Sequence, residues 1–397
     1  MHNSYLNAFK QLHNWVDSEN YKGWDPFDGL NSKFFQITPL KNSRFFRLAW
    51  IQFFKRNPVN LRKVLLIEKD YNAKGIGLFL FSYCKLLEVN KKTSGLFKEE
   101  ILSKIEYLAD KLIEMISPGY SGACWGYNFD WQNRLFFQPK GTPTVVATSF
   151  TANAFFEAYD VTGNQKYLDT ALSSLDFIIK DLNKTKEKDG FIFSYSPLDN
   201  SKVYNATLLG ARLLARGYHY TKEEQYKVLA EQAILPIVRK QNTDGSWIYG
   251  EAKTQNWIDS FHTGYNLECL FDYSYYTKDN QFMSSFEKGL GFYLNNFFLE
   301  DGKPKYYSDK LYPIDIHAPA QLIVMLSKTG KLNQNIELAN KVLNWTIKNM
   351  QNKKGYFYYQ MKPYFSSRIS YMRWAQAWMF YAFSNYFKII NYNENLD

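Results

Sequence analysis

The sequence predicts an all-α protein in which six helical hairpins close into an (α/α)6 toroid. One observation behind this prediction is a turn rich in glycine and aromatic residues that recurs between pairs of helical segments. The other is a polar residue that opens the second helix of each pair, at nearly constant steps of 56, 57, 55 and 56 residues. These residues are Ser149, Asn205, His262, His317 and Arg373. Because the core of a repeat protein grows with each unit, residues 1–397 are expected to form one domain.

The helices of each pair differ in composition. Four segments rich in Ala, Leu and Gly are apolar on nearly every side, which predicts buried inner helices at 150–158, 206–217, 267–276 and 318–326. A further inner helix is expected from Lys74 to Leu87. Amphipathic segments predict outer helices at 167–182, 223–239, 281–296 and 336–350. Residues 1–60 are expected to form an N-terminal extension and the first outer helix, which comes either from 44–54 or from the N-terminal residues. Short hairpins are expected at 190–196 and 356–360.

Charge and aromatic content indicate the kind of partner. The net charge is +10, from 48 Lys and Arg against 38 Asp and Glu, which favours an anionic partner. The basic residues are scattered and match no nucleic-acid-binding pattern, so an acidic oligo- or polysaccharide is expected rather than nucleic acid. The 32 Phe, 31 Tyr and 10 Trp predict that some aromatic side chains line a cavity.

The cysteines and the hydropathy indicate the compartment. Cys84, Cys124 and Cys269 are isolated in apolar surroundings, which is typical of buried thiols in a reducing compartment. No secretory leader pattern and no apolar stretch of about 18 residues occurs, so we expect a cytoplasmic protein without a membrane span. No cofactor is expected, because phosphate-binding loops and zinc motifs are missing. Asp259, Cys269 and His317 do not suggest a metal site, since Cys269 falls about two turns into its helix.

The repeat predicts where a functional site lies. Parallel inner helices begin on the same rim, so the five polar residues that open them should converge there. The first turn of a helix offers unpaired N–H groups and the positive end of the helix dipole, both of which suit a carboxylate or phosphate.

Two histidines are the candidate catalytic groups. His262 follows Asp259 and His317 follows Asp315, and a histidine oriented by a carboxylate can serve as a general acid or base. Tyr265 is a candidate partner that donates a proton. The alternative for either histidine is a structural role in capping its helix.

Aromatic and basic side chains near this rim are the candidate substrate ligands. Aromatic faces stack on sugar rings, and arginine pairs with a uronate carboxylate through two parallel hydrogen bonds. The candidates are Trp125, Tyr127, Ser149, Tyr204, Asn205, Trp247, Tyr312, Arg368, Tyr371 and Arg373. Residues 125–131 are expected to form an aromatic wall, and Asp25 and Asp28 lie in a loop that could close over the rim. Core packing, structural ion pairs and turn formation are the alternatives.

Several segments resemble known families. The turn from Gln241 to Trp247 (QNTDGSW) resembles turns of the terpenoid-cyclase and prenyltransferase superfamily. Residues 149–386 resemble the six-hairpin VpsJ-like proteins encoded in bacterial polysaccharide-biosynthesis clusters, and residues 23–32 match the start expected of that group. Residues 259–267 (DSFHTGYNL) are loosely similar to a motif of glucuronyl C5-epimerases. The resemblance implies a toroid fold and carbohydrate chemistry.

The favoured hypothesis is a protein of polysaccharide biosynthesis or modification that acts on an acidic, uronate-containing glycan by epimerisation or elimination. A glycoside hydrolase is an alternative, but most such enzymes need a pair of carboxylates, and the rim offers His, Tyr and Arg more visibly. A terpenoid cyclase is a second alternative, although the acidic Asp-x-Asp-Asp motif is missing. A glycan-binding scaffold without catalysis is the third.

Overall fold

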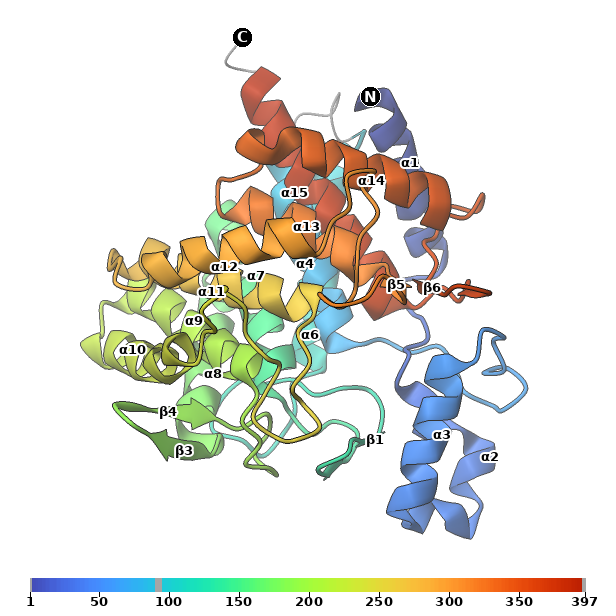
Figure 1. Ribbon diagram of the computed structural model, residues 1–397, viewed down its shortest axis with the longest axis horizontal. Coiled ribbons are helices and arrows are strands. Elements are labelled where there is room, and N and C mark those ends of the chain that lie inside the picture. Colours follow the sequence, from blue (N-terminus) through green and yellow to red (C-terminus); the bar gives the residue numbers. More distant parts are fainter. Residues whose placement is uncertain (1, 90–94, 395–397) are drawn as a thin grey trace.

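Six inner helices form a closed ring in the computed structural model, which describes residues 2–89 and 95–394 (Figure 1). They are α4 (Ala73–Leu87), α7 (Val145–Thr162), α9 (Tyr204–Thr221), α11 (Ser260–Thr277), α13 (His317–Lys328) and α15 (Ala377–Glu394), the last preceded by a π-helical turn (Met372–Gln376). Each contacts the next in this order, and α15 contacts α4. The ring is therefore complete, and the predicted (α/α)6 toroid is confirmed.

Six further helices surround the ring. They are α1 (His2–Ser18), α6 (Lys98–Glu114), α8 (Gln165–Asp176), α10 (Glu224–Arg239), α12 (Met283–Asn296) and α14 (Ile336–Met350). Each packs against the inner helix of its own hairpin, and α1 packs on α15. Apolar residues three or four positions apart give each outer helix one buried face, such as Ile101, Ile105 and Leu108 of α6, and leave the opposite face to solvent.

Side-chain caps fix where three of the inner helices begin. Asn72, Thr144 and Asp259 each accept a hydrogen bond from a backbone N–H in the first turn of α4, α7 and α11. Asp315 does the same for the N–H of His317 at the start of α13. Because these caps hold the helix starts, side chains from the first two or three residues of each inner helix project at the same end of the ring.

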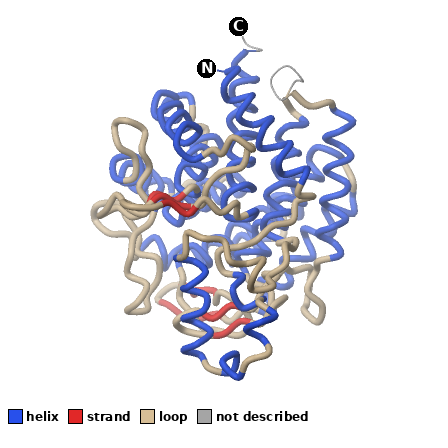
Figure 2. The backbone as a smooth tube through the Cα atoms, turned by 90° about the vertical axis from the view of Figure 1, so that its right-hand side faces the viewer, coloured by secondary structure: helices blue, strands red, loops and turns tan. Residues whose placement is uncertain are grey.

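Helix α3 (Arg44–Arg56) is not an outer helix of the ring, since α1 fills that place. Together with η1 (Asp28–Asn31), α2 (Lys33–Gln36) and η2 (Pro39–Asn42) it forms a unit that protrudes from the ring (Figure 1). Figure 2, turned by 90°, shows its helices at the foot of the molecule. A small core of Leu30, Phe35 and Ile51 holds the unit together. Helix α3 is amphipathic, as the sequence indicates, but its buried face packs against this small core.

Short strands join the helices. Strands β1 (Trp131–Gln132) and β2 (Phe137–Gln138) form one hairpin, and β3 (Lys184–Glu187) and β4 (Gly190–Phe193) form another, which includes part of the predicted hairpin at 190–196. Strand β6 (Gln360–Met361) pairs with β5 (Ile314–Asp315) and β7 (Ser366–Ser367). Of the predicted hairpin at 356–360, only Gln360 lies in a strand.

Ion pairs join the inner helices toward their C-terminal ends. Arg216 of α9 lies 3.1 Å from Glu157 and 2.8 Å from Asp160 of α7, and Lys85 of α4 lies 2.5 Å from Glu157. A second group joins α9, α11 and α13 and consists of Arg212, Glu268, Asp272 and Lys328. Each group connects three adjacent inner helices.

The buried carboxylate of Glu157 is expected to make stability depend on acid pH. Burial alone would raise its pKa, but the charges of Lys85 and Arg216 outweigh burial and lower the pKa from 4.5 to about 2. A carboxylate with a lowered pKa stabilises the fold above its unfolded-state pKa. Protonation removes that contribution, about 3 kcal/mol, as the pH falls from 4.5 toward 2. Urea unfolding of wild type and Glu157→Gln at pH 7 and near pH 3 measures it. Equal differences between the two proteins at both pH values would contradict the prediction.

Candidate functional site

A cavity of about 410 Å³ opens at the N-terminal ends of the inner helices. Every inner helix contributes a residue from its first turn or from the turn directly before it, in the order Lys74, Val146, Asn205, His262, His317 and Arg373. The repeat thus brings residues from 74 to 373 around one space. Of the five residues expected to converge, four line the cavity, and Val146 takes the place expected for Ser149.

Loops and the protruding unit build the remaining wall. Aromatic side chains from the loops that precede the inner helices include Tyr127, Phe129, Trp131, Tyr195, Tyr249, Trp257, Tyr306 and Tyr307. Helix α3 contributes Leu48, Gln52 and Lys55 to the opposite side of the same space. Exposed aromatic faces can stack on sugar rings, so the wall is suited to a carbohydrate.

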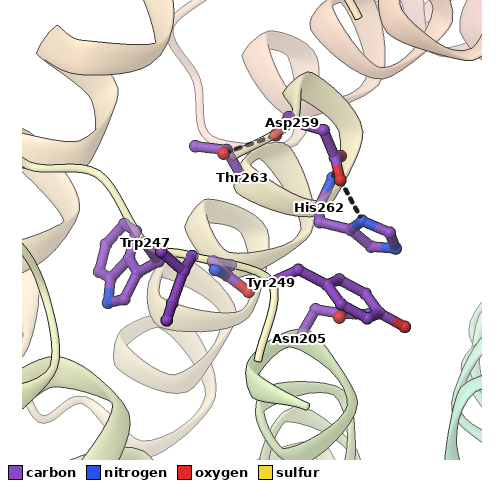
Figure 3. Close-up of a pocket in the computed structure, with 8 residues that line it drawn as sticks. Asn205, Trp247, Tyr249, Asp259, His262 and Thr263 are labelled. Carbon is purple, nitrogen blue, oxygen red and sulfur yellow. Dashed lines mark hydrogen bonds and ion pairs between the residues drawn. The ribbon is translucent and has the colours of Figure 1, made fainter. Parts of the chain in front are cut away.

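His262 is held by the carboxylate that caps its own helix (Figure 3). Its Nδ1 lies 2.7 Å from Oδ2 of Asp259, and its backbone N–H donates to Oδ1 at 3.0 Å. The indole N–H of Trp257 also donates to Oδ2, at 2.8 Å. With Nδ1–H donated to Asp259, Nε2 carries the lone pair and is the nitrogen left for a ligand. The imidazole side chain keeps 19% of its surface exposed, so a ligand in the cavity can reach it.

His317, Tyr265 and Lys74 form a buried chain of hydrogen bonds. The Tyr265 hydroxyl lies 2.7 Å from Nε2 of His317, and Nζ of Lys74 donates to the same hydroxyl oxygen at 3.3 Å. The rings of Phe261 and His317 stack with centroids 4.4 Å apart. Nδ1 of His317 is buried without a hydrogen-bond partner.

Burial sets the charge state of this chain. It raises the pKa of the Tyr265 hydroxyl well above 10, so the tyrosine stays protonated and its O–H donates a hydrogen bond to His317. It also lowers the pKa of His317 well below 6.5, and the positive charges of Lys74 and Arg373 lower it further. The pKa of Lys74 is lowered well below 10.5 by burial and by Arg373 and Arg212. His317 is therefore a neutral imidazole near pH 7.

The cavity lining is strongly basic. Five basic side chains line it: Lys55, Arg56, Lys74, Arg134 and Arg373. Within the described part of the chain, no Asp or Glu lines the cavity itself. Asp25 lies behind the wall, where it accepts hydrogen bonds from Nε (2.6 Å) and Nη2 (2.8 Å) of Arg373. Arg373 is thus paired, and burial lowers the pKa of Lys55 and of Lys74, but an anionic ligand would meet no described carboxylate in the lining.

Two amide side chains offer unused acceptors. The side-chain carbonyl oxygens of Asn205 and Gln255 are buried in the cavity wall without a hydrogen-bond partner. Buried polar atoms are normally paired, so each is available to a ligand that donates a hydrogen bond. Sugar hydroxyl groups are such donors.

The aromatic segment at 125–131 is divided between cavity and core. Tyr127 lines the cavity, where its hydroxyl lies 2.9 Å from that of Tyr195. Trp125 does not line it, because its ring stacks on Phe155 and its indole N–H donates to the backbone of Leu112. Trp125 and Tyr127 therefore lie in different surroundings although only one residue separates them in the sequence.

Other candidate residues lie outside this cavity. Ser149 is buried and donates to the Leu209 carbonyl, because it falls one turn too far into α7. Trp247 borders a small recess beside His262, but its ring points away from the histidine (Figure 3) and its N–H donates to the Ile237 carbonyl. These positions correct the expectation that both residues lie within reach of a ligand in the cavity.

Four further candidates are not among the lining residues: Tyr204, Tyr312, Arg368 and Tyr371. Tyr204 and Tyr371 are buried by packing, Tyr312 is on an exposed loop, and Arg368 lies over the ring of Tyr358. They are near the predicted rim in sequence, but Tyr204 is packed at the first position of α9, and the other three lie in the segments before α13 and α15, outside the cavity lining.

The candidate carboxylates Asp315 and Asp28 are not among the residues that line the cavity. Asp315 accepts hydrogen bonds from the backbone N–H of His317 and from the side chains of Gln360 and Trp374, not from the His317 ring. Burial raises the pKa of Asp315 to about 6. Asp28 pairs with the buried Arg62 at 2.8 Å and so anchors the N-terminal loop. In the described residues no group of three or more metal-binding side chains comes together.

Lys74, Tyr249, Trp257 and Trp374 line the cavity but were missed by sequence reasoning. Lys74 could have been found, because it is a lysine at the second position of an apolar inner helix and is therefore equivalent to Asn205 of α9. Tyr249 and Trp257 carry no such signal, since loops do not share the helical period, and Trp374 lies in the π-helical turn before α15.

Comparisons with known proteins establish the fold. No family model and no curated protein matches the sequence. Among solved structures, a cellobiose 2-epimerase from Bacillus thermoamylovorans is 16% identical over 81% of this chain and 88% of its own, with a TM-score of 0.62. A family 76 α-mannanase from Bacteroides thetaiotaomicron is 14% identical over 82% and 87%, also at 0.62. An unsaturated glucuronyl hydrolase specific for heparin is 12% identical over 98% and 97%, again at 0.62. The chain shares the α/α-toroid fold of these enzymes.

Proposed function

We propose that this protein is a carbohydrate-modifying enzyme that removes a proton next to the carboxylate of a uronate-containing glycan. The observation that carries the proposal is the composition of the cavity wall. His262 presents a free ring nitrogen to a space that five basic side chains line and that no described carboxylate lines. The shared fold with enzymes named for cellobiose epimerisation, mannan and glucuronyl groups supports a carbohydrate ligand.

The proposed chemistry begins at Nε2 of His262. It takes the proton from the carbon next to the uronate carboxylate, while Asp259 stabilises the imidazolium that forms. The electron pair left on that carbon spreads into the carboxylate, and Arg373 and Lys74 stabilise the added negative charge. An anion beside Lys74 also favours its protonated form, because opposite charge offsets burial.

Elimination fits this geometry better than epimerisation. In elimination the electron pair expels the neighbouring glycosidic oxygen, which takes a proton from Tyr265. His262 and Tyr265 lie one turn apart on α11, with ring centroids 5.8 Å apart, so both act from the same wall. Two-base epimerisation needs groups on opposite faces of the sugar, for which His317 or Tyr265 would have to face His262 across the ligand.

The alternatives are less well supported. Hydrolysis by a matched pair of carboxylates lacks that pair among the lining residues. A terpenoid cyclase would need an almost wholly apolar cavity, whereas this one carries five basic side chains. The VpsJ-like resemblance favours a role in polysaccharide biosynthesis, and the three free, buried cysteines favour a cytoplasmic location.

Incubation with uronate-containing oligosaccharides in deuterium oxide tests the proposal. Elimination is expected to produce an unsaturated uronate with strong ultraviolet absorbance, and epimerisation is expected to leave one deuterium at the reacting carbon, detected by mass spectrometry. Neutral oligosaccharides of the same length are the control and should stay unchanged. Binding of the acidic glycan without either product would overturn the enzyme proposal in favour of a scaffold.

A further inference from the structure

The protruding unit, defined here as residues 28–67, differs from the rest of the surface in its apolar exposure. The described residues include twenty exposed large hydrophobic side chains, and nine of them lie between 33 and 67. They are Phe34, Ile37, Leu40, Phe45, Phe46, Phe53, Val59, Val64 and Leu66. Ile37 is 81% exposed and Phe45 72%. So dense a group of exposed apolar side chains marks an interaction surface rather than ordinary scatter.

Helix α3 has three distinct faces. Ile51 and Phe54 point into the molecule, and Leu48, Gln52 and Lys55 line the cavity. The third face is exposed and carries Phe45, Phe46, Ala49 and Phe53, which lie one to two turns apart on one side of the helix. No other described element covers this outward apolar face.

The same unit carries most of the net charge of the protein. Residues 28–67 contain eight Lys and Arg and one acidic residue, Asp28, while the whole chain has a net charge of +10. Arg62 is buried against Asp28, and Lys33 pairs with Glu68 at the surface. Lys41, Arg44 and Lys63 are exposed around the apolar face. Aromatic side chains on one face, flanked by Lys and Arg, are typical of helices that lie in the interface of an anionic membrane.

We propose that the exposed face of α3 docks on an anionic lipid bilayer, with Phe45, Phe46 and Phe53 at the headgroup boundary and Lys41 and Arg44 against lipid phosphates. In the described residues, no helix is long and apolar enough to cross a bilayer, and surface docking requires none. The unit stands out from the ring, so the outer helices do not block its approach to a flat surface (Figures 1 and 2). This inference goes beyond the proposed chemistry and does not depend on it.

Charge and shape favour a lipid surface over other occupants. A second copy of this chain would present the same exposed basic residues, such as Lys41, Arg44 and Lys63, and repel the first. A nucleic acid would pair with the basic side chains but would leave exposed apolar groups such as Ile37 without a partner. A bilayer with anionic headgroups satisfies both the charges and the apolar side chains.

Sedimentation with vesicles tests the proposal. The full chain is expected to bind phosphatidylcholine vesicles that contain phosphatidylglycerol at least tenfold more tightly than vesicles of phosphatidylcholine alone, and less tightly as salt rises. The double variant Phe45→Ser/Phe46→Ser is expected to lose at least tenfold in affinity. Lys41→Gln/Arg44→Gln is expected to lose about tenfold and to show a weaker salt dependence.

A matched control changes exposed residues at the other end of an inner helix. Tyr275→Ser/Lys278→Gln removes an exposed aromatic and a lysine near the C-terminal end of α11 and should bind like wild type. Circular dichroism and thermal unfolding verify that each variant is folded. Equal binding by the phenylalanine variant, equal binding to neutral vesicles, or binding to RNA but not to vesicles would each overturn the proposal. So would a wild-type dimer that the phenylalanine variant abolishes.

Discussion

Replacing His262 with glutamine is expected to lower turnover of a uronate-containing glycan by about 10²–10⁴-fold, the usual effect of losing a general acid–base group. Glutamine fills similar space but cannot take up the proton. The side chain is partly exposed, and the cap of α11 is formed by Asp259, so stability should change little. Steady-state kinetics and urea unfolding of the variant measure the two effects separately.

His219→Gln is the matched control, since His219 lies near the far end of α9 and does not line the cavity. It should keep wild-type kinetics. Asp259→Asn retains a helix cap but removes the charge that orients His262, so turnover should fall and its pH profile should shift. A His262→Gln protein that turns over normally would remove His262 from the mechanism.

Replacing Arg373 with methionine is expected to destabilise the protein by about 3–5 kcal/mol, because it leaves Asp25 as a buried charge without its partner. Asp25 and Arg373 are 348 positions apart in sequence, so their pair joins the N-terminal loop to the turn before α15. Urea unfolding measures the loss.

The double variant Arg373→Met/Asp25→Asn separates stability from function. With both charges gone, much of the stability should return, whereas affinity for an acidic glycan should stay low because Arg373 itself lines the cavity. Restored binding together with restored stability would show that Arg373 acts only as a structural partner of Asp25.

The repeat made the ring and part of the site predictable. Evenly spaced polar residues identified the starts of the inner helices, and burial of small apolar segments distinguished inner from outer helices. The register was missed at α7, where the lining position is the apolar Val146 and the polar Ser149 lies one turn deeper. A prediction of lining residues from polarity alone therefore fails where one repeat has an apolar residue at the lining position.

The rest of the site depends on packing that no sequence period records. Tyr195, Tyr249 and Trp257 reach the cavity from loops of different length, and their direction is set by contacts such as the stacking of Tyr249 on Trp257, with centroids 4.6 Å apart. Amphipathicity correctly marked α3 as a helix. It could not reveal that one side of α3 packs on its own small core and another side lines the cavity.

The closure of the ring also determines the order in which the protein can mature on the ribosome. Helix α4 is made early and α15 near the end of the chain, yet Phe79 packs on Phe380 and Phe81 on Tyr381. Until α15 emerges, the apolar flank of α4 has no partner, and a nascent chain several hundred residues long carries an open seam. The cavity wall contributed by Arg373 and Trp374 is missing for the same period. A chaperone that shields the seam must therefore act before α15 emerges, whereas a ligand can bind in the complete cavity only afterwards.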